Sequence, residues 1–362
     1  MNLKCGIVGL PNVGKSTLFN ALTKTNILIA NYPFCTIKPN ISSVPIIDNR
    51  LNNIAKIVLP KKIVANYIEL VDIAGLVQGA SKGEGLGNQF LSNIKDTDAL
   101  LHVVRCFKSD VVVHVNGITN PINDIEVINL ELILADITVC KKFMDKIKNK
   151  YKTNKSATSI LELNLLNRCL EHLSECHMLR TMHMTAEEQK IINCLRLLTI
   201  KPMLYIANIN SSKEDNDFLN QVQEVAKLEQ AVVIAIDADN ELKNIRNSNI
   251  VLNDKLDFSG SKSIITKIIF ASYGLLNLYT FFTVGVQEVR AWTIKNGSTA
   301  VSAANVIHSD FSRGFIRVKV MKYDDFIFYK GEYGVKSAGK IRMEGKKYIV
   351  QDGDILHFLF HV

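Results

Sequence analysis

A glycine-rich loop near the N-terminus carries the residues with the clearest chemistry in this chain of 362 residues. Gly9 and Gly14 bracket the loop, and Lys15 and Ser16 follow at once, which matches the pattern G-x-x-x-x-G-K-[ST]. In this pattern the glycines let backbone N–H groups surround a polyphosphate, the lysine reaches the β- and γ-phosphates, and the serine hydroxyl ligates Mg²⁺. A helix beginning at about Gly14 points its N-terminus at the same anion. The sequence therefore predicts a nucleoside triphosphate site made by Gly9, Asn12, Val13, Gly14, Lys15, Ser16 and Thr17, with Lys15 also acting in catalysis.

A second set of residues suits the metal ion and the γ-phosphate. Asp72 follows an apolar strand predicted over residues 67–71, which places its carboxylate beside the magnesium, where it holds a metal-bound water. The N–H of Gly75 then meets the γ-phosphate, as in a D-x-x-G switch. Between these motifs Thr36 offers a hydroxyl that ligates Mg²⁺ and senses the γ-phosphate, whereas Ser42 and Ser43 are expected in the next strand. The predicted metal ligands are Ser16, Thr36 and, through water, Asp72.

The group that orients the attacking water is left open by the sequence. Leu76 stands where Ras-like GTPases place a glutamine, and leucine does no polar work. His114 is one candidate, and an exposed or structural histidine is the alternative. Asn12 either binds K⁺, which supplies the charge of an arginine finger, or serves the geometry of the loop. His102 lies in a buried strand pattern and is expected to be a core histidine with its hydrogen bonds satisfied.

The segment expected to read the base departs from the guanine pattern. GTPases use N-K-x-D, in which the aspartate accepts hydrogen bonds from guanine. Here the strand predicted over residues 203–207 is followed by Asn208, Ile209, Asn210 and Ser211. A serine hydroxyl cannot replace a bidentate carboxylate, which argues against strong GTP selectivity. We expect Asn208 to brace the loop and Ile209 to pack on the base or meet it through its backbone.

An α/β core is predicted to position these motifs. Apolar runs typical of buried parallel strands lie at 6–10, 67–71, 99–104, 203–207 and 231–236. Between about 128 and 200 apolar residues recur at helical spacing, which predicts two long antiparallel helices, either a plain hairpin or a partner-binding coiled coil. The two stripes are Leu130, Ile133, Leu134, Ile137, Met144 and Ile147, and Leu161, Leu165, Leu166, Cys169, Leu170 and Leu173. Alternating runs at 286–294, 314–320, 348–350 and 355–360 predict a small mixed β domain.

The composition indicates in which compartment the protein works and which kinds of partner it binds. Lys and Arg number 43 against 35 Asp and Glu, a net charge of +8 that suits an acidic partner such as RNA or reflects biased codon usage. Seven cysteines without a C-x-x-C pair indicate reduced thiols in a cytosolic protein rather than a disulfide framework or a zinc site. The first strand begins almost at once, so we expect no leader. The uncharged stretch 268–286 is interpreted as a buried helix running into a strand, not a membrane span.

Several longer motifs resemble one family. The run of residues 79–87 (GASKGEGLG) is similar to the Obg branch of P-loop NTPases, and residues 31–36, 105–107 and 281–294 resemble the YchF/Obg-like ATPases specifically. The resemblance spans essentially the whole chain. It implies a Ras-like P-loop core at 1–128 and 201–277, an inserted helical domain at 129–200, and a β-grasp TGS domain at 278–362. The family usually shows N-x-x-E in the base-reading segment, and this chain has Ser211 in place of the glutamate.

The resemblance also implies an activity and partners. It implies a cytoplasmic protein that hydrolyses ATP with Mg²⁺, associates with ribosomes and acts as a switch in translation and stress responses. We expect contact with the large subunit or the whole ribosome, including rRNA, a monomer, and no membrane partner. Basic residues interleaved with aromatic ones in the C-terminal part, and lysines on the predicted hairpin, are compatible with RNA contact. Two alternatives stay open: a ribosome-assembly GTPase of the Obg type, and a ribosome-binding module with a vestigial nucleotide site.

Overall fold

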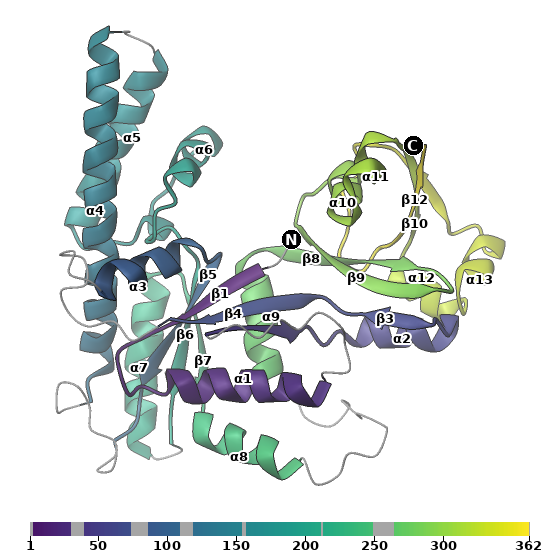
Figure 1. Cartoon of the computed structure of the whole chain (residues 1–362), viewed down its shortest axis with the longest axis horizontal. Helices are drawn as coiled ribbons and strands as arrows, with labels where there is room; N and C mark the ends of the chain where they lie inside the picture. The colour runs from purple at the N-terminus through teal and green to yellow at the C-terminus, as the bar shows by residue number, and fades with distance from the viewer. Residues whose placement is uncertain are drawn as a thin grey trace. The chain divides into compact units, whose positions relative to one another are not determined.

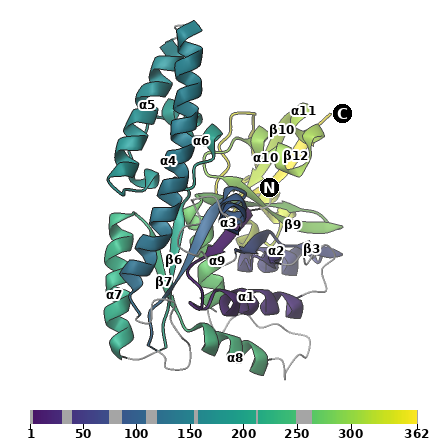
Figure 2. The same ribbon diagram turned by 60° about the vertical axis from the view of Figure 1, so that its left-hand side comes forward.

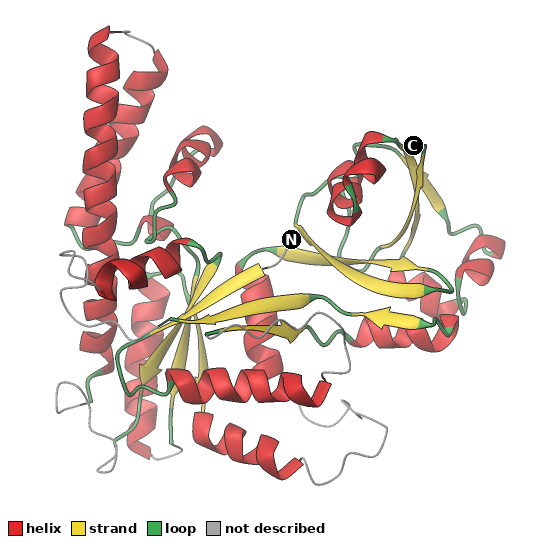
Figure 3. Cartoon of the chain, in the orientation of Figure 1, coloured by secondary structure: helices red, strands yellow, loops and turns green. Residues whose placement is uncertain are grey.

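Two compact units make up the chain. The computed structural model describes residues 3–29, 40–73, 86–108, 119–153, 157–210, 213–248 and 264–361. The larger unit comprises Lys4–Ser43 and Glu69–Ile268, and the smaller one comprises Met1–Leu3, Val44–Ile68 and Ile269–Val362. Helices and strands alternate along the larger unit, whereas short helices lie among the strands in the last part of the smaller unit (Figures 1 and 3).

The larger unit is built on a sheet in the order β2-β4-β1-β5-β6-β7. Its strands are β1 (Leu3–Val8), β2 (Ile41–Pro45), β4 (Tyr67–Asp72), β5 (Ala99–Arg105), β6 (Met203–Asn208) and β7 (Val232–Ile236). β1, β5, β6 and β7 pair in parallel, so their carboxyl ends lie at one edge. Every residue of β5 and β6 is buried, because their near-continuous apolar runs are covered on both faces. The predicted parallel core is confirmed.

Helices cover both faces of this sheet. They are α1 (Lys15–Ile29), α3 (Leu86–Lys95), α7 (Lys213–Leu228) and α8 (Ala238–Ser248), and the next helix, α9 (Ile264–Leu275), belongs mostly to the smaller unit. Figure 2 shows α1 and α8 together on one side and α7 with α4 (Pro121–Thr153) on the other. The stretch 268–286 is the end of α9 followed by β8 (Leu278–Val284), as predicted. No helix in the described ranges is long and apolar enough to cross a membrane.

The predicted helical insertion is present as α4 (Pro121–Thr153) and α5 (Ala157–Ser174), followed by η2 (Leu179–Thr181) and α6 (Ala186–Leu195). Their shared core includes Ile133, Met144 and Ile147 from α4. Asp136 secures the chain where it returns toward β6, because its carboxylate accepts the N–H groups of Leu198 at 2.9 Å and Thr199 at 2.7 Å. The stripe prediction was wrong at Leu130, Leu134 and Leu161, which are 45%, 37% and 38% exposed. The predicted residues Ile133, Leu165 and Leu166 are buried, and on α4 the buried face includes Leu132 in place of Leu130 and Leu134.

The smaller unit is a second mixed sheet, in the order β11-β10-β12-β8-β9-β3. Its further strands are β3 (Lys62–Val64), β9 (Glu288–Lys295), β10 (Phe315–Met321), β11 (Arg342–Glu344) and β12 (Ile355–Phe360), and its helices are α2 (Asn49–Val58), α10 (Ala300–Ile307), α11 (Ser309–Arg313), α12 (Tyr323–Phe328) and α13 (Glu332–Ser337). β8 and β9 form an antiparallel hairpin, and β12 runs parallel to β8, as in a β-grasp module. The strand predicted at 348–350 is wrong: there a single bridge joins Ile349 to Thr299.

Two apolar clusters cover the two faces of this second sheet. Alanines of α10 pack on one cluster with Phe281 and Phe358. Leu51 and Ile54 of α2 pack on the other with Phe282. Residues 44–68, which the sequence analysis assigned to the nucleotide domain, thus supply both a covering helix and the edge strand β3, which pairs in parallel with β9.

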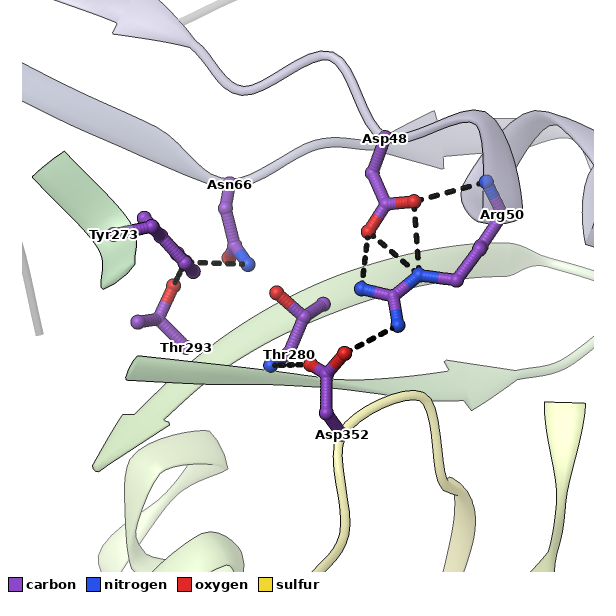
Figure 4. A network of polar contacts seen from close by, with 7 residues as sticks. All are labelled: Asp48, Arg50, Asn66, Tyr273, Thr280, Thr293 and Asp352. Atoms are coloured by element: carbon purple, nitrogen blue, oxygen red, sulfur yellow. Dashed lines mark hydrogen bonds and ion pairs between the residues drawn. The ribbon is translucent and has the colours of Figure 1, made fainter. Parts of the chain in front are cut away.

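Polar contacts also join residues 44–68 to the rest of the smaller unit (Figure 4). The guanidinium of Arg50 bonds the carboxylate of Asp48 and, at 2.6 Å, that of Asp352, which in turn accepts the N–H of Thr280 at 2.8 Å. Nearby, Asn66 donates to the hydroxyl of Tyr273 at 3.5 Å. The segment is therefore an integral part of this sheet's packing, which the local hydrophobic pattern did not reveal.

Candidate nucleotide-binding site

Backbone conformation and close packing both require glycine at the two ends of the phosphate loop. The loop joins the end of β1 at Val8 to the start of α1 at Lys15. Gly9 has a φ of +151°, and a Cβ there would lie 2.5 Å from the carbonyl oxygen of Val103 on β5. Gly14 has a φ of +100°, and a Cβ there would overlap the side-chain amide of Asn208. Neither conformation suits an L side chain, so the loop keeps its shape only with glycines.

Lys15 is held at the mouth of this loop. Its side chain is buried, and Nζ donates a hydrogen bond of 2.6 Å to the carbonyl oxygen of Leu10, five residues earlier. Burial lowers the pKa of Lys15 to about 8, against the opposing effect of the Asp72 carboxylate. A poorly hydrated ammonium group of this kind binds a phosphate strongly, because little hydration is lost on binding.

Ser16 and Asp72 meet beside this lysine. The hydroxyl of Ser16 donates to Oδ2 of Asp72 at 3.5 Å, and the N–H of Asp72 donates to the carbonyl oxygen of Asn40 at 2.8 Å. Burial raises the pKa of Asp72, while Lys15 and Ser16 act in the opposite direction. A hydroxyl and a carboxylate are hard oxygen ligands, which is the donor set that Mg²⁺ prefers. The pair therefore fits a magnesium ion and its waters.

The remaining loop residues differ in exposure. Asn12 is exposed and has a left-handed φ of 62°, a conformation that asparagine tolerates better than most residues. This conformation is by itself a sufficient reason for asparagine at this position. Val13 is buried and Thr17 half-buried. The predicted residues Thr36, Gly75, His114 and Ser211 lie outside the described ranges.

Asn208 connects three parts of the site. Its Nδ2 donates to the carbonyl oxygen of Val13 at 3.0 Å, and its Oδ1 accepts the N–H of Ala238 at 3.2 Å. Its own carbonyl oxygen accepts the N–H of Cys106 at 2.8 Å. The side chain is buried, so it holds the phosphate loop to the end of β6 and to the start of α8. These contacts match the bracing role expected from the sequence.

The neighbouring residues shape the side of the site where the base is expected. The N–H of Ile209 donates to the carbonyl oxygen of Ile236 at 2.8 Å, so a backbone contact from Ile209 to a base would have to use its carbonyl. The N–H of Asn210 donates to Oδ2 of Asp215 at 2.7 Å. Asp215 was not predicted as a site residue, although an acidic residue in the first turn of a helix after a loop is a recognisable capping signal.

His102 lies behind the site in the core. It is 1% exposed, as expected, but its Nδ1 has no hydrogen-bond partner among the described residues, so the expectation of a fully satisfied histidine was wrong there. Burial lowers the pKa of His102 to about 3, and the charges of Arg180 and Lys15 act in the same direction. The ring is therefore neutral at physiological pH.

Together these features define a class of protein. A loop between a parallel strand and a helix, with Lys15, Ser16 and Asp72 gathered at the carboxyl edge of the sheet, is the site of a P-loop nucleotide-binding protein. A family model described as "50S ribosome-binding GTPase" matches residues 4–142. A second model, YchF-GTPase_C, described as "Protein of unknown function (DUF933)", matches residues 278–361.

Full-length relatives identify the family. The chain is 53% identical to the "Ribosome-binding ATPase YchF" of Buchnera aphidicola from Acyrthosiphon pisum and 52% identical to the protein of that name from Escherichia coli O157:H7, in each case over 100% of both chains. The solved structure of the Schizosaccharomyces pombe YchF GTPase superposes with a TM-score of 0.84 at 35% identity, covering 99% of this chain and 98% of that one. The chain belongs to the YchF family.

Proposed function

We propose that this protein is an ATPase that hydrolyses ATP to ADP and phosphate and acts on the ribosome as a nucleotide-controlled switch in translation or stress regulation. The observation that carries the proposal is the gathering of Lys15, Ser16 and Asp72 at the N-terminus of α1. The printed names of the relatives from Buchnera and E. coli support both the nucleotide and the partner.

Residues of the phosphate loop and of its neighbours have separate parts in the proposed reaction. Backbone N–H groups between Gly9 and Thr17 surround the phosphates, helped by the positive end of α1. The ammonium of Lys15 leaves the carbonyl of Leu10 and binds the β- and γ-phosphates, where it stabilises charge in the transition state. Gly75 is proposed to donate its N–H to the γ-phosphate. Asn208 and Ile209 are proposed to form the base side, with Asn208 also holding the loop through Val13.

The metal ligands in this proposal are Ser16, Thr36 and, through water, Asp72. Mg²⁺ supplies neutralisation of the phosphate charge when it is bound. K⁺ bound at Asn12 is a further part of the proposal, although the left-handed backbone already accounts for an asparagine there. Leu76 leaves no glutamine to orient the attacking water, and His114 is the residue proposed to do so.

The choice between ATP and GTP follows from the base-reading segment. Relatives carry both names, since the S. pombe structure is titled a GTPase. Guanine recognition needs a carboxylate that accepts from its N1–H and N2–H₂, and position 211 is serine. The carboxylate of Asp215 is engaged in binding the N–H of Asn210. The proposal is therefore ATP, with an Obg-type GTPase as the second candidate.

The remaining parts of the chain are proposed to meet the ribosome. We assign residues 1–128 and 201–277 to nucleotide binding, 129–200 to the helical insertion and 278–362 to the TGS-like module, with 44–68 packed into that module's sheet. Lysines of α4 and basic residues of the C-terminal sheet would contact rRNA phosphates. The proposal includes a monomer working in the cytoplasm, where ribosomes are found.

Calorimetry and sedimentation test this proposal. ATP and GTP are titrated separately into the full chain with Mg²⁺ in potassium buffer, and ribosome co-sedimentation is measured with each nucleotide. At least about tenfold preference for ATP, with ribosome binding that depends on the nucleotide, supports the proposal. Equal affinity or GTP preference refutes the ATPase assignment. If Lys15→Ala abolishes ATP binding but leaves ribosome binding and cellular function intact, the nucleotide site is vestigial.

A further inference from the structure

A buried polar cluster lies where α4 packs against β5 and α7. We call it the polar joint: Asn129 on α4, Arg180 on η2, Tyr205 on β6 and Glu229 just after α7, with His102 of β5 beside them. Arg180 forms an ion pair with Glu229, and their side chains are 8% and 14% exposed. The ring of His102 lies 5.3 Å from that of Tyr205. The joint thus contains residues of the hairpin and of the nucleotide-binding core.

One carboxylate holds the joint together. Glu229 accepts the hydroxyl of Tyr205 at 2.6 Å on Oε2 and the amide of Asn129 at 2.6 Å on Oε1, in addition to the guanidinium of Arg180. Burial and the charge of Glu229 raise the pKa of Tyr205, so the phenol stays protonated and keeps donating. A buried ion pair stabilises a fold only when such additional hydrogen bonds satisfy it.

Several groups of the joint have no hydrogen-bond partner among the residues that the structure describes. These buried atoms are Nε and Nη1 of Arg180, Oδ1 of Asn129 and Nδ1 of His102. Within the described part of the chain, two cationic donors and an amide acceptor of the same cluster are therefore unpaired. Donors and an acceptor of the same cluster could pair with one another in an alternative arrangement, which would satisfy groups that the present arrangement leaves buried.

Two strands connect the joint directly to the nucleotide site. His102 pairs with Tyr205 in the sheet, and three residues further along Arg105 pairs with Asn208. That distance is roughly 10 Å at the usual rise of a strand. Asn208 in turn holds the phosphate loop through the carbonyl of Val13. On its other side the joint includes residues from both ends of the insertion, since α4 enters the hairpin and η2 leaves it.

We propose that the polar joint couples nucleotide binding at the phosphate loop to the position of the helical hairpin. Binding of ATP·Mg²⁺ shifts β5 and β6 at their carboxyl ends, and the joint changes its hydrogen-bond pairing so that η2 and the root of α4 move with them. By reciprocity, a partner that holds the hairpin changes the affinity for ATP by the same factor. The inference rests on the nucleotide site proposed above.

Amide hydrogen exchange of the full chain tests the coupling. Peptides covering residues 121–136 and 178–200 are followed with and without saturating ATP·Mg²⁺, and ATP binding is measured separately by calorimetry. In the unmodified chain ATP should change exchange in both segments by about fivefold or more. In Tyr205→Phe, which removes one hydroxyl from the joint, the change should fall to less than about twofold while ATP affinity stays within about twofold.

Two further variants make the result decisive. Glu229→Gln should remove the response to ATP in the same way as Tyr205→Phe. If the loss of the Glu229 charge unfolds the chain, the result with Tyr205→Phe decides the test alone. Arg168→Gln is the matched control, because it breaks an ion pair with Glu188 on the hairpin that lies outside the joint, and it should respond like the unmodified chain. The inference is overturned if ATP binds but leaves exchange in both segments unchanged, or if Tyr205→Phe responds fully. Absence of ATP binding would instead refute the proposed function.

Discussion

Asn208→Ala is the substitution that most directly tests how this site is built. The side chain of Asn208 makes two buried hydrogen bonds, of 3.0 Å to the carbonyl of Val13 and of 3.2 Å from the N–H of Ala238. Alanine removes both and leaves a carbonyl and an N–H without partners in a region that water does not reach. The phosphate loop thereby loses its connection to β6 and to α8.

The expected cost follows from these contacts. Leaving a buried polar group unsatisfied costs about 1–3 kcal/mol, so two such groups cost about 2–4 kcal/mol after partial relaxation. Part of that loss reduces the stability of the fold, and part disorders the loop that binds ATP. If about half falls on binding, the affinity for ATP drops between about fivefold and thirtyfold, since 1.4 kcal/mol corresponds to a factor of ten.

Isothermal titration calorimetry with ATP·Mg²⁺, together with thermal unfolding, measures both parts. Asn210→Ala is the matched control, because residue 210 is exposed and binds Asp215 through its backbone N–H, which alanine retains. Asn208→Asp should bind ATP no better than the alanine variant, because a carboxylate oxygen would then face the carbonyl of Val13. The reasoning is refuted if Asn208→Ala binds ATP as tightly as the unmodified chain and melts at the same temperature.

Three further predictions follow from burial and charge. Because the pKa of Lys15 is about 8, the affinity for ATP should fall by up to about tenfold per pH unit as the pH rises above 8. In Lys15→Arg, whose side chain stays charged, this pH dependence should disappear. Calorimetry from pH 7 to 9.5 measures the dependence in both proteins, and an unchanged slope in the variant would contradict the prediction. The pKa of His102 is about 3 in the folded chain and about 6.5 in the unfolded chain, so the unfolded chain takes up the proton first as the pH falls. The free energy of unfolding should therefore decline as the pH falls from about 6.5 toward 3. In denaturant titrations His102→Phe should show a decline that is shallower by up to about 1.4 kcal/mol per pH unit. Ile54→Ala, at a fully buried position of α2, should lower the free energy of unfolding of the smaller unit by about 2–5 kcal/mol and speed amide hydrogen exchange in β8 and β9. Phe328→Ala is the control, because residue 328 is 78% exposed, and it should change neither the stability nor the exchange.

The parts of the molecule that could be predicted from sequence are those decided by neighbours in the chain. The phosphate loop was recognisable because its glycines and lysine act within a few residues of one another. The buried strands were recognisable because uninterrupted apolar runs are typical of a parallel sheet covered on both faces. The hairpin followed from helical spacing, although the buried face was misplaced at Leu130 and Leu134, since both faces of α4 carry apolar residues and only packing selects between them.

Other features depend on residues that the fold brings together from far apart. The glycine at position 14 is required by the amide of Asn208, almost two hundred residues later, as well as by its own φ. Nothing near Glu229 in the sequence indicates that it accepts hydrogen bonds from Tyr205 and Asn129. The conformation of Lys15, bonded to the carbonyl of Leu10, likewise depends on the exact curvature of the loop.

Local spacing and residue type were therefore sufficient to predict the phosphate loop, the parallel core and the family. The place of residues 44–68 in the C-terminal sheet depends instead on the packing of distant segments, since α2 is equally amphipathic whichever core it covers. The same packing selects which side chains brace the loop and which meet in the polar joint. Such contacts arise when distant segments are packed together, and their energies depend on burial and geometry that no local pattern encodes.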